Sequence, residues 1–186
     1  SAVIAIARPG ALDFADQYAE YVRSGDFQSQ HEVYDDVLSY TGGIPLYQEQ
    51  LMKMAVNIGF TLDESEQLRR IVGKKKVDQM PAWKAKIEAK IIENKIPIEA
   101  GDVLWRVAED SANYSFNKSH SIAYSTLAAW TTYLKFNHPK EFFLSLLKMT
   151  KFEPTPQAEV SRISQELPFF GIKLLPPSIL ITKNYY

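Results

Sequence analysis

Residues 45–73 read PLYQEQLMKMAVNIGFTLDESEQLRRIVG and predict two consecutive amphipathic helices. Apolar side chains recur every three or four residues after Pro45, and Gly59 ends the first run. Thr61 followed three residues later by Glu64 is a capping-box pattern, which predicts the start of a second helix that ends at Gly73.

The same helix signals continue along the chain, while strand signals are few. Further helices are predicted after Pro81, after Pro97, over 119–136, after Pro139 and from 155 to 171. Residues 3–6 fit either a short strand or a helical turn, residues 24–32 a polar loop, and residues 172–175 a brief strand-like alternation. The prediction is a mainly α fold, with a helical domain over 1–150 and a helix and linker over 151–186 that ends in an irregular or strand-like tail.

The composition of the 186 residues is that of a globular protein, with 46% hydrophobic and 23% charged residues. The absence of cysteine excludes disulfides, thiolate zinc sites, iron–sulfur clusters and a cysteine nucleophile. The three histidines lack metal-ligand spacing, and no apolar run is long enough to span a membrane. We expect an intracellular protein without a signal peptide. Because the chain begins with Ser rather than Met, we also expect a piece of something longer.

The net charge of −1 hides a strong segregation of charge. Residues 1–66 carry 3 basic and 11 acidic side chains, whereas residues 67–95 carry 9 basic and 3 acidic ones. Residues 96–186 are close to neutral, with 9 basic and 8 acidic side chains. The basic block therefore predicts contact with a polyanion, and the alternative is a solvated, lysine-rich helix face.

Five basic residues gather where the second predicted helix ends: Arg69, Arg70, Lys74, Lys75 and Lys76. One or two cations there are explained by the partial negative charge of a helix C-terminus. Because five cations repel one another, a triphosphate or a DNA backbone explains the group better.

A second segment, residues 113–121, precedes the long apolar helix and reads NYSFNKSHS. Free backbone N–H groups at a helix start attract an anion, and Asn117, Lys118, Ser119 and His120 add side-chain donors. Tyr114 and Phe116 alternate with these polar groups and are candidates for stacking on a base. The alternative interpretation is a serine N-cap beside a packed phenylalanine.

Together these motifs resemble the fingers region of C-family replicative DNA polymerases, namely the alpha subunit of bacterial DNA polymerase III and its phage relatives. The resemblance covers nearly the whole chain and rests on motifs in one order. They are Arg8-Pro9-Gly10, Tyr47-Gln48-Glu49-Gln50-Leu51-Met52, Leu68-Arg69-Arg70, Gly73-Lys74-Lys75-Lys76, Phe116-Asn117-Lys118-Ser119-His120-Ser121, Tyr133-Leu134-Lys135, His138-Pro139, Glu141-Phe142 and residues 171–179.

The resemblance implies a multi-helix fingers domain that binds the incoming dNTP and primer–template DNA during DNA replication. The side chains then expected to face the dNTP phosphates are Arg69, Arg70, Lys74, Lys75, Lys76, Asn117, Lys118, Ser119 and His120. Lys84, Lys86 and Lys90 on the following helix are expected to contact the DNA backbone. We expect the two basic segments to share one concave face.

The resemblance also implies that the catalytic parts of a nucleotidyltransferase lie elsewhere. Its palm aspartates, which hold Mg²⁺, fall outside these residues, so we expect neither a catalytic residue nor a bound metal here, and an inactive isolated chain. The implied partners are dNTP, primer–template DNA, the palm and thumb, and a sliding clamp reached through missing regions, without a membrane. The implied location is the cytoplasm of a bacterial or phage-infected cell. The alternatives are a stand-alone helical nucleic-acid-binding module without catalysis, and a helical interaction protein.

Overall fold

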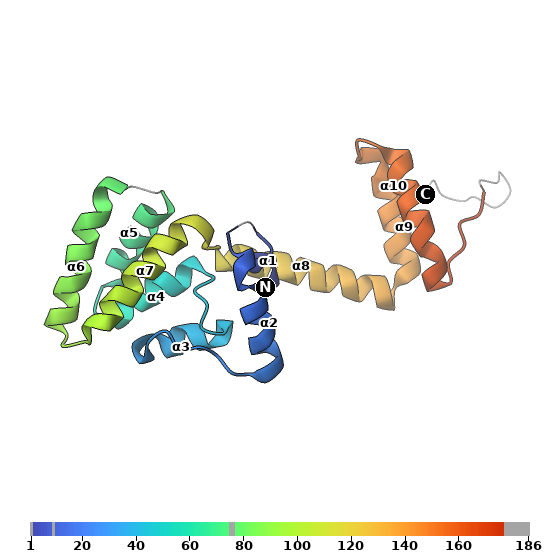
Figure 1. The fold of residues 1–186 in the computed structure, drawn as a ribbon. Helices are drawn as coiled ribbons and strands as arrows, with labels where there is room; N and C mark the ends of the chain where they lie inside the picture. Colours follow the sequence, from blue (N-terminus) through green and yellow to red (C-terminus); the bar gives the residue numbers. More distant parts are fainter. Residues whose placement is uncertain (1, 9, 75–76, 177–186) are drawn as a thin grey trace. The chain divides into compact units, whose positions relative to one another are not determined.

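The computed structural model describes the backbone of residues 2–8, 10–74 and 77–176, and their side chains except at positions 77 and 112–114. Within these residues the regular structure is helical and no strand forms a sheet (Figure 1), which confirms the predicted mainly α class. The α-helices are α1 (Ala2–Ile6), α2 (Ala15–Ser24), α3 (Asp35–Leu38), α4 (Gln48–Asn57), α5 (Leu62–Gly73), α6 (Met80–Glu93), α7 (Ile98–Tyr114), α8 (Lys118–Asn137), α9 (Pro139–Met149) and α10 (Pro156–Glu166). Short 3-10 turns connect several of them: Leu12–Phe14, Glu32–Tyr34, Ser39–Thr41, Val77–Gln79, Thr150–Phe152 and Leu167–Phe170.

The chain forms two compact units, Ser1–Tyr124 and Ser125–Tyr186, whose boundary lies within α8. The domain boundary expected from the sequence, at residue 150, stays a prediction. The boundary between the two compact units lies earlier, after Tyr124. No described helix is long and apolar enough to cross a bilayer.

Two predicted helices, α4 and α5, sit at the centre of the N-terminal unit. The five apolar positions of the first run, Tyr47, Leu51, Met54, Ala55 and Ile58, are all buried. Leu51, Met54, Ala55 and Ile58 join the inner faces of α5, α6 and α7 in one core, whereas Tyr47 belongs to a second core. Removing a side chain of this size from water contributes about 1.5–3 kcal/mol, so packing rather than local propensity holds these helices together.

The start of α5 carries the predicted capping box. The backbone N–H of Glu64 donates to Thr61 Oγ1 at 3.2 Å, and the backbone N–H of Thr61 donates to Glu64 Oε2 at 2.8 Å. The reciprocal bonds satisfy donors that a helix start leaves without partners. The Thr61 hydroxyl also donates to Glu64 Oε2 at 3.0 Å, and the hydrogen bonds from the Thr61 N–H and then its hydroxyl lower the pKa of the Glu64 carboxyl.

A second core of the N-terminal unit joins segments that are far apart in sequence. Residues Tyr47 and Phe116 form a parallel β-bridge, in which the Phe116 N–H donates to the Leu46 carbonyl at 2.9 Å. The Gln48 N–H donates to the Phe116 carbonyl at 3.0 Å. Phe116 packs there with apolar side chains of α1. Residues 3–6, whose sequence fits either a strand or a helical turn, belong to this helix.

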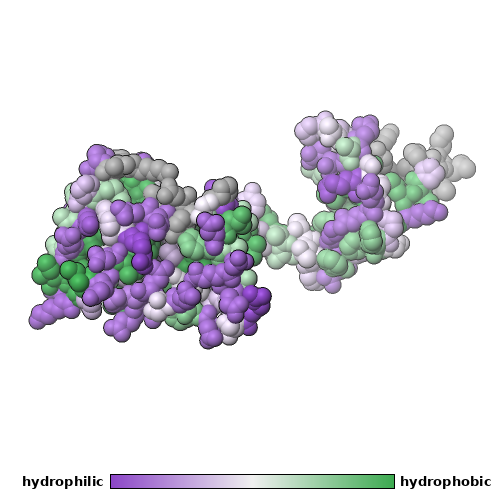
Figure 2. All heavy atoms as spheres, viewed as in Figure 1, coloured by the Kyte–Doolittle hydropathy of each residue, from purple (hydrophilic) through white to green (hydrophobic). Residues whose placement is uncertain are grey.

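The surface of the N-terminal unit is mostly hydrophilic on the face shown in Figure 2, with an apolar patch near the end of α6 and the start of α7. Ile92 and Ile98 are exposed there. They border a groove that is also lined by Ile87, Ile91 and Trp105.

The C-terminal unit has its own small core of Phe143, Leu147, Ile163 and Leu167, contributed by α9, α10 and the 3-10 turn that follows α10. Residues 172–176 form neither helix nor strand, so the described part of the tail is irregular rather than strand-like. The apolar side chains of α8 in this unit, including Trp130, are exposed.

Candidate nucleotide-binding site

The first turn of α4 contacts both basic segments that the sequence singles out. Gln48 Oε1 accepts a hydrogen bond from Arg69 Nη1 at 3.1 Å. The carboxylate of Glu49 accepts the backbone N–H of Lys118, with both oxygens within 3.1 Å of the nitrogen. Because Gln48 and Glu49 are consecutive, the end of α5 and the start of α8 both contact the first turn of α4. We call Arg69, Arg70 and Lys118 the basic cluster.

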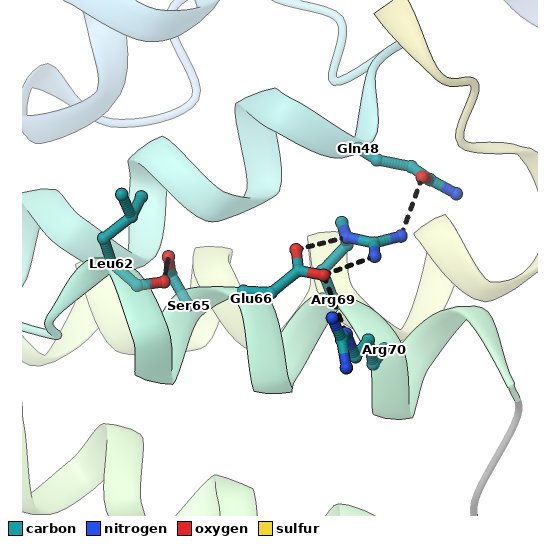
Figure 3. Close-up of polar contacts among 6 residues, drawn as sticks. All are labelled: Gln48, Leu62, Ser65, Glu66, Arg69 and Arg70. Atoms are coloured by element: carbon teal, nitrogen blue, oxygen red, sulfur yellow. Dashed lines mark hydrogen bonds and ion pairs between the residues drawn. The ribbon is translucent and has the colours of Figure 1, made fainter.

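The two arginines of the basic cluster share one carboxylate (Figure 3). Arg69 donates from Nε and Nη2 to the two oxygens of Glu66, each at 2.6 Å, and Arg70 donates from Nε to Glu66 Oε1 at 2.8 Å. The Arg69 and Glu66 side chains are 28% and 30% exposed, whereas that of Arg70 is 66% exposed. The hydrogen bonds from Arg69 and then Arg70 lower the pKa of Glu66 to about 2, so this carboxylate is charged at neutral pH.

Lys118 extends its side chain over aromatic rings. Its Nζ lies 4.5 Å from the centre of the Tyr40 ring and 5.7 Å from that of Tyr47. Within the part of the chain that the structure describes, it makes no ion pair, so its positive charge is not offset by direct contact with a carboxylate. Burial, followed by the neighbouring Tyr47 and Glu49, raises the pKa of Tyr40 to about 12, which keeps this ring neutral at physiological pH.

Side chains of the protein itself already occupy donors at the start of α8. Glu49 accepts the Lys118 N–H, and Asn117 Oδ1 accepts the backbone N–H of His120 at 2.9 Å. The sequence argument that free backbone N–H groups attract an anion is therefore wrong for these two groups, because Glu49, which is distant in sequence, satisfies one and the neighbouring Asn117 satisfies the other. A phosphate would meet the Lys118 ammonium rather than these backbone donors.

The ring of Phe116, which precedes α8, is followed by the rings of His120 and Tyr124 in the first turns of α8. The His120 ring lies 5.7 Å from that of Phe116 and 4.7 Å from that of Tyr124, and the Arg8 guanidinium lies 5.0 Å from the Phe116 ring. Phe116 is only 8% exposed, so in this structure its ring packs in the core. Base stacking on Phe116 stays a prediction, and the Tyr114 side chain is outside the described part of the chain.

Of the remaining residues predicted to contact phosphate, the structure describes Lys74 and Ser119. Lys74 follows the last turn of α5, where its backbone N–H donates to the Arg70 carbonyl at 3.0 Å, and its side chain is exposed. Ser119 is exposed in the first turn of α8. Lys75 and Lys76 lie outside the described residues.

The lysines of α6 form a separate group. Lys84 lies 5.8 Å from the Trp105 ring, Lys86 lies 4.4 Å from the Trp83 ring, and Lys90 pairs with Glu93 at 3.0 Å. Lys86 and Lys90 also contribute to the lowered pKa of Glu64, so they face the beginning of α5. The basic cluster is at the other end of that helix.

Several residues of the site were missed by sequence reasoning. The spacing of Glu66 from Arg69 and Arg70, three and four positions along a helix, is a signal that could have identified Glu66. Gln48 and Glu49 stood within a quoted motif without an assigned role. Tyr40 carries no sequence signal, because its contact with Lys118 depends on the tertiary fold.

Two further features of the described residues bear on the site: a polar cavity, and the arrangement of acidic and histidine side chains. A polar cavity elsewhere in the N-terminal unit, lined in part by Gln17, Gln30 and Arg106, includes none of the predicted site residues. No three acidic or histidine side chains gather closely enough among the described residues to share a metal ion.

The amino-acid sequence of the chain is similar to one family of known proteins. Residues 1–95 match the family described as the bacterial DNA polymerase III alpha subunit finger domain. The chain is 35% identical over 185 residues to DNA polymerase III subunit alpha of Thermus aquaticus and 37% identical over 182 residues to that of Aquifex aeolicus, with 96% of this chain covered in each. It is 35% identical over 187 residues to that of Escherichia coli, again with 96% of the chain covered. The chain spans only about 15% of the length of these relatives.

Proposed function

The chain belongs to the finger-domain family of the bacterial DNA polymerase III alpha subunit, and we propose that it works as the fingers of a DNA-directed DNA polymerase. In this proposal the basic cluster binds the triphosphate of the incoming deoxynucleotide. Lys74, Lys75, Lys76, Asn117, Ser119 and His120 extend the same site, and Lys84, Lys86 and Lys90 contact the backbone of the primer–template.

The observation that carries the proposal is that Arg69 and the backbone of Lys118 both contact the first turn of α4. Residues 1–66 have a net charge of −8, so a general basic surface does not explain the cations gathered on this unit, and a bound anion explains them better. Phosphoryl transfer is catalysed mainly by positioning and by neutralisation of charge, and arginine and lysine supply both. The arrangement suits a compact, highly charged anion.

The rest of such a polymerase would supply the metal ions and the partner domains. Two Mg²⁺ ions would be held by palm carboxylates outside this chain and would activate the primer end and stabilise the leaving phosphate. The palm and thumb, a sliding clamp and the primer–template would be the partners. Such an enzyme would work in the cytoplasm of a bacterial or phage-infected cell.

The proposal is tested by titrating the chain with Mg²⁺·dATP and following amide shifts by NMR. We expect Arg69→Ala and Lys118→Ala each to raise the dissociation constant about 10-fold, the effect of losing one charge-assisted hydrogen bond. The matched controls are Arg162→Ala, whose arginine is also held by a glutamate three residues earlier, and Lys140→Ala, whose lysine is exposed on α9. Both controls should bind like the wild type.

A parallel titration with labelled primer–template DNA tests the α6 lysines. Lys84→Ala and Lys90→Ala should each reduce the slope of log affinity against log salt by about 1. DNA binding without any triphosphate binding would favour the stand-alone nucleic-acid-binding module instead. Binding of neither ligand would leave the helical interaction protein.

A further inference from the structure

We propose that Glu66 is a positioning residue that makes the basic cluster selective for a compact triphosphate over extended DNA. This inference rests on the proposed function. In Figure 3 the Glu66 carboxylate accepts hydrogen bonds from Nε of both Arg69 and Arg70.

Glu66 differs from the other glutamates of the described chain that pair with an arginine on the same helix. Glu20 contacts Arg23 alone and Glu159 contacts Arg162 alone. Glu66 binds Arg69 through both of its oxygens, and one of these oxygens also accepts from Arg70. Gln48 fixes the far side of the Arg69 guanidinium, so that side chain is held at three of its nitrogens.

The contacts leave part of each guanidinium open for a ligand. A guanidinium has five N–H donors. Of these, three on Arg69 and one on Arg70 have a partner among the described residues. Because both guanidiniums are tied to one carboxylate, their open donors stay close together. They can reach neighbouring oxygens of one triphosphate, but cannot spread along successive phosphates of a DNA strand.

The negative charge of Glu66 also favours a triphosphate over DNA. Glu66 offsets one of the two positive charges, and its pKa of about 2 keeps it ionised at every pH at which a polymerase works. Without that carboxylate the arginines would repel each other and present two independent cations. Independent cations attract any polyanion and increase salt-dependent, non-specific binding to DNA.

Two substitutions at one position separate charge from geometry. Glu66→Asp keeps the negative charge but is one methylene shorter, so it cannot hold both guanidiniums. We expect it to weaken binding of Mg²⁺·dATP about 3–10-fold and to leave primer–template affinity unchanged. Glu66→Gln removes the charge, and we expect it to increase primer–template affinity and steepen the salt slope by about 1. Both variants should therefore lower the ratio of triphosphate affinity to DNA affinity.

The matched controls are Glu159→Asp and Glu159→Gln, which break a similar arginine pair in the C-terminal unit and should keep the wild-type ratio. Arg70→Lys is a further test that preserves every charge and removes the Nε contact with Glu66, so it too should lower the ratio. Helical circular dichroism confirms that each variant is folded.

The outcomes distinguish this inference from the proposed function. If the Glu66 variants and Arg70→Lys keep the wild-type ratio while Arg69→Ala loses triphosphate binding, Glu66 is only a helix-stabilising partner and the inference is wrong. If Arg69→Ala and Lys118→Ala bind Mg²⁺·dATP like the wild type, the proposed function itself fails.

Discussion

At the scale of single residues, the basic cluster depends on side chains that are not basic. Glu66, Gln48 and Glu49 hold the Arg69 guanidinium and the Lys118 backbone at one end of the N-terminal unit. Tyr40 and Tyr47 lie under the Lys118 ammonium, where a cation–π contact is worth about 0.5–2 kcal/mol. Cations that are held in place lose less side-chain entropy when they bind an anion.

The pairing of Glu66 with two arginines predicts a specific pH dependence of stability. Its pKa falls from an ordinary value near 4.5 to about 2, so the unfolded chain takes up this proton first as the pH falls. The stability that Glu66 contributes is then complete above about pH 5 and disappears between about pH 5 and pH 2. We expect the free energy of unfolding to fall more steeply over this range in the wild type than in Glu66→Gln, measured by urea denaturation at each pH. Parallel curves for the two proteins would contradict the ion pairing.

At the scale of elements, local sequence signals predict where the helices form. They do not predict the contacts that α5 and the start of α8 make with α4. The capping box of α5, the glycine that ends it, and the prolines in the first turns of α6, α9 and α10 act within a few residues. The sequence therefore predicts these helices closely. By contrast, Gln48 reaches Arg69 and Glu49 reaches Lys118 across 21 and 69 positions, and such contacts depend on how the cores pack.

The same difference explains why the backbone donors at the start of α8 are not free. From its sequence this helix start shows free N–H groups, a lysine and aromatic side chains, which favour an anion and a base. In the structure the Glu49 carboxylate accepts the Lys118 N–H, and Phe116 packs in a core, while base stacking stays a prediction. Local sequence can predict what a segment offers, but it cannot predict which partner from another helix occupies it.

The capping box gives a prediction about one element. Thr61→Ala removes the hydroxyl that accepts the Glu64 N–H, and loss of an N-cap of this kind costs about 0.5–2 kcal/mol. Thr155 is a matched control, because it occupies the N-cap of α10 without a side-chain capping bond. We expect thermal denaturation, followed by circular dichroism, to show a lower midpoint for Thr61→Ala and little change for Thr155→Ala. Equal midpoints for the two variants would mean that the capping box adds no stability.

At the scale of the whole molecule, two compact units share a chain that spans about 15% of the length of its relatives. The candidate nucleotide site lies within the N-terminal unit, and so does the whole match to the finger-domain family, over residues 1–95. Binding of a triphosphate by its phosphates needs only cations held in place, which this unit has. Forming a phosphodiester bond needs more, because the primer hydroxyl attacks the α-phosphate and pyrophosphate leaves, and the charge on these groups would be neutralised by metal ions that palm carboxylates would hold.

The last prediction follows from this separation of binding from chemistry. The purified chain should not extend a primer when it is given all four dNTPs and Mg²⁺, because the carboxylates that would hold two metal ions are proposed to belong to the palm. The measurement is a gel-based extension assay with a labelled primer–template, run beside the intact polymerase that carries this segment. In that intact enzyme, Lys118→Ala should lower kcat/KM for dNTP about 10-fold or more, because a charge directed at phosphate matters most as charge develops in the transition state. Template-dependent extension by the isolated chain would overturn the assignment of catalysis to other domains. Full activity of the Lys118→Ala polymerase would remove Lys118 from the nucleotide site.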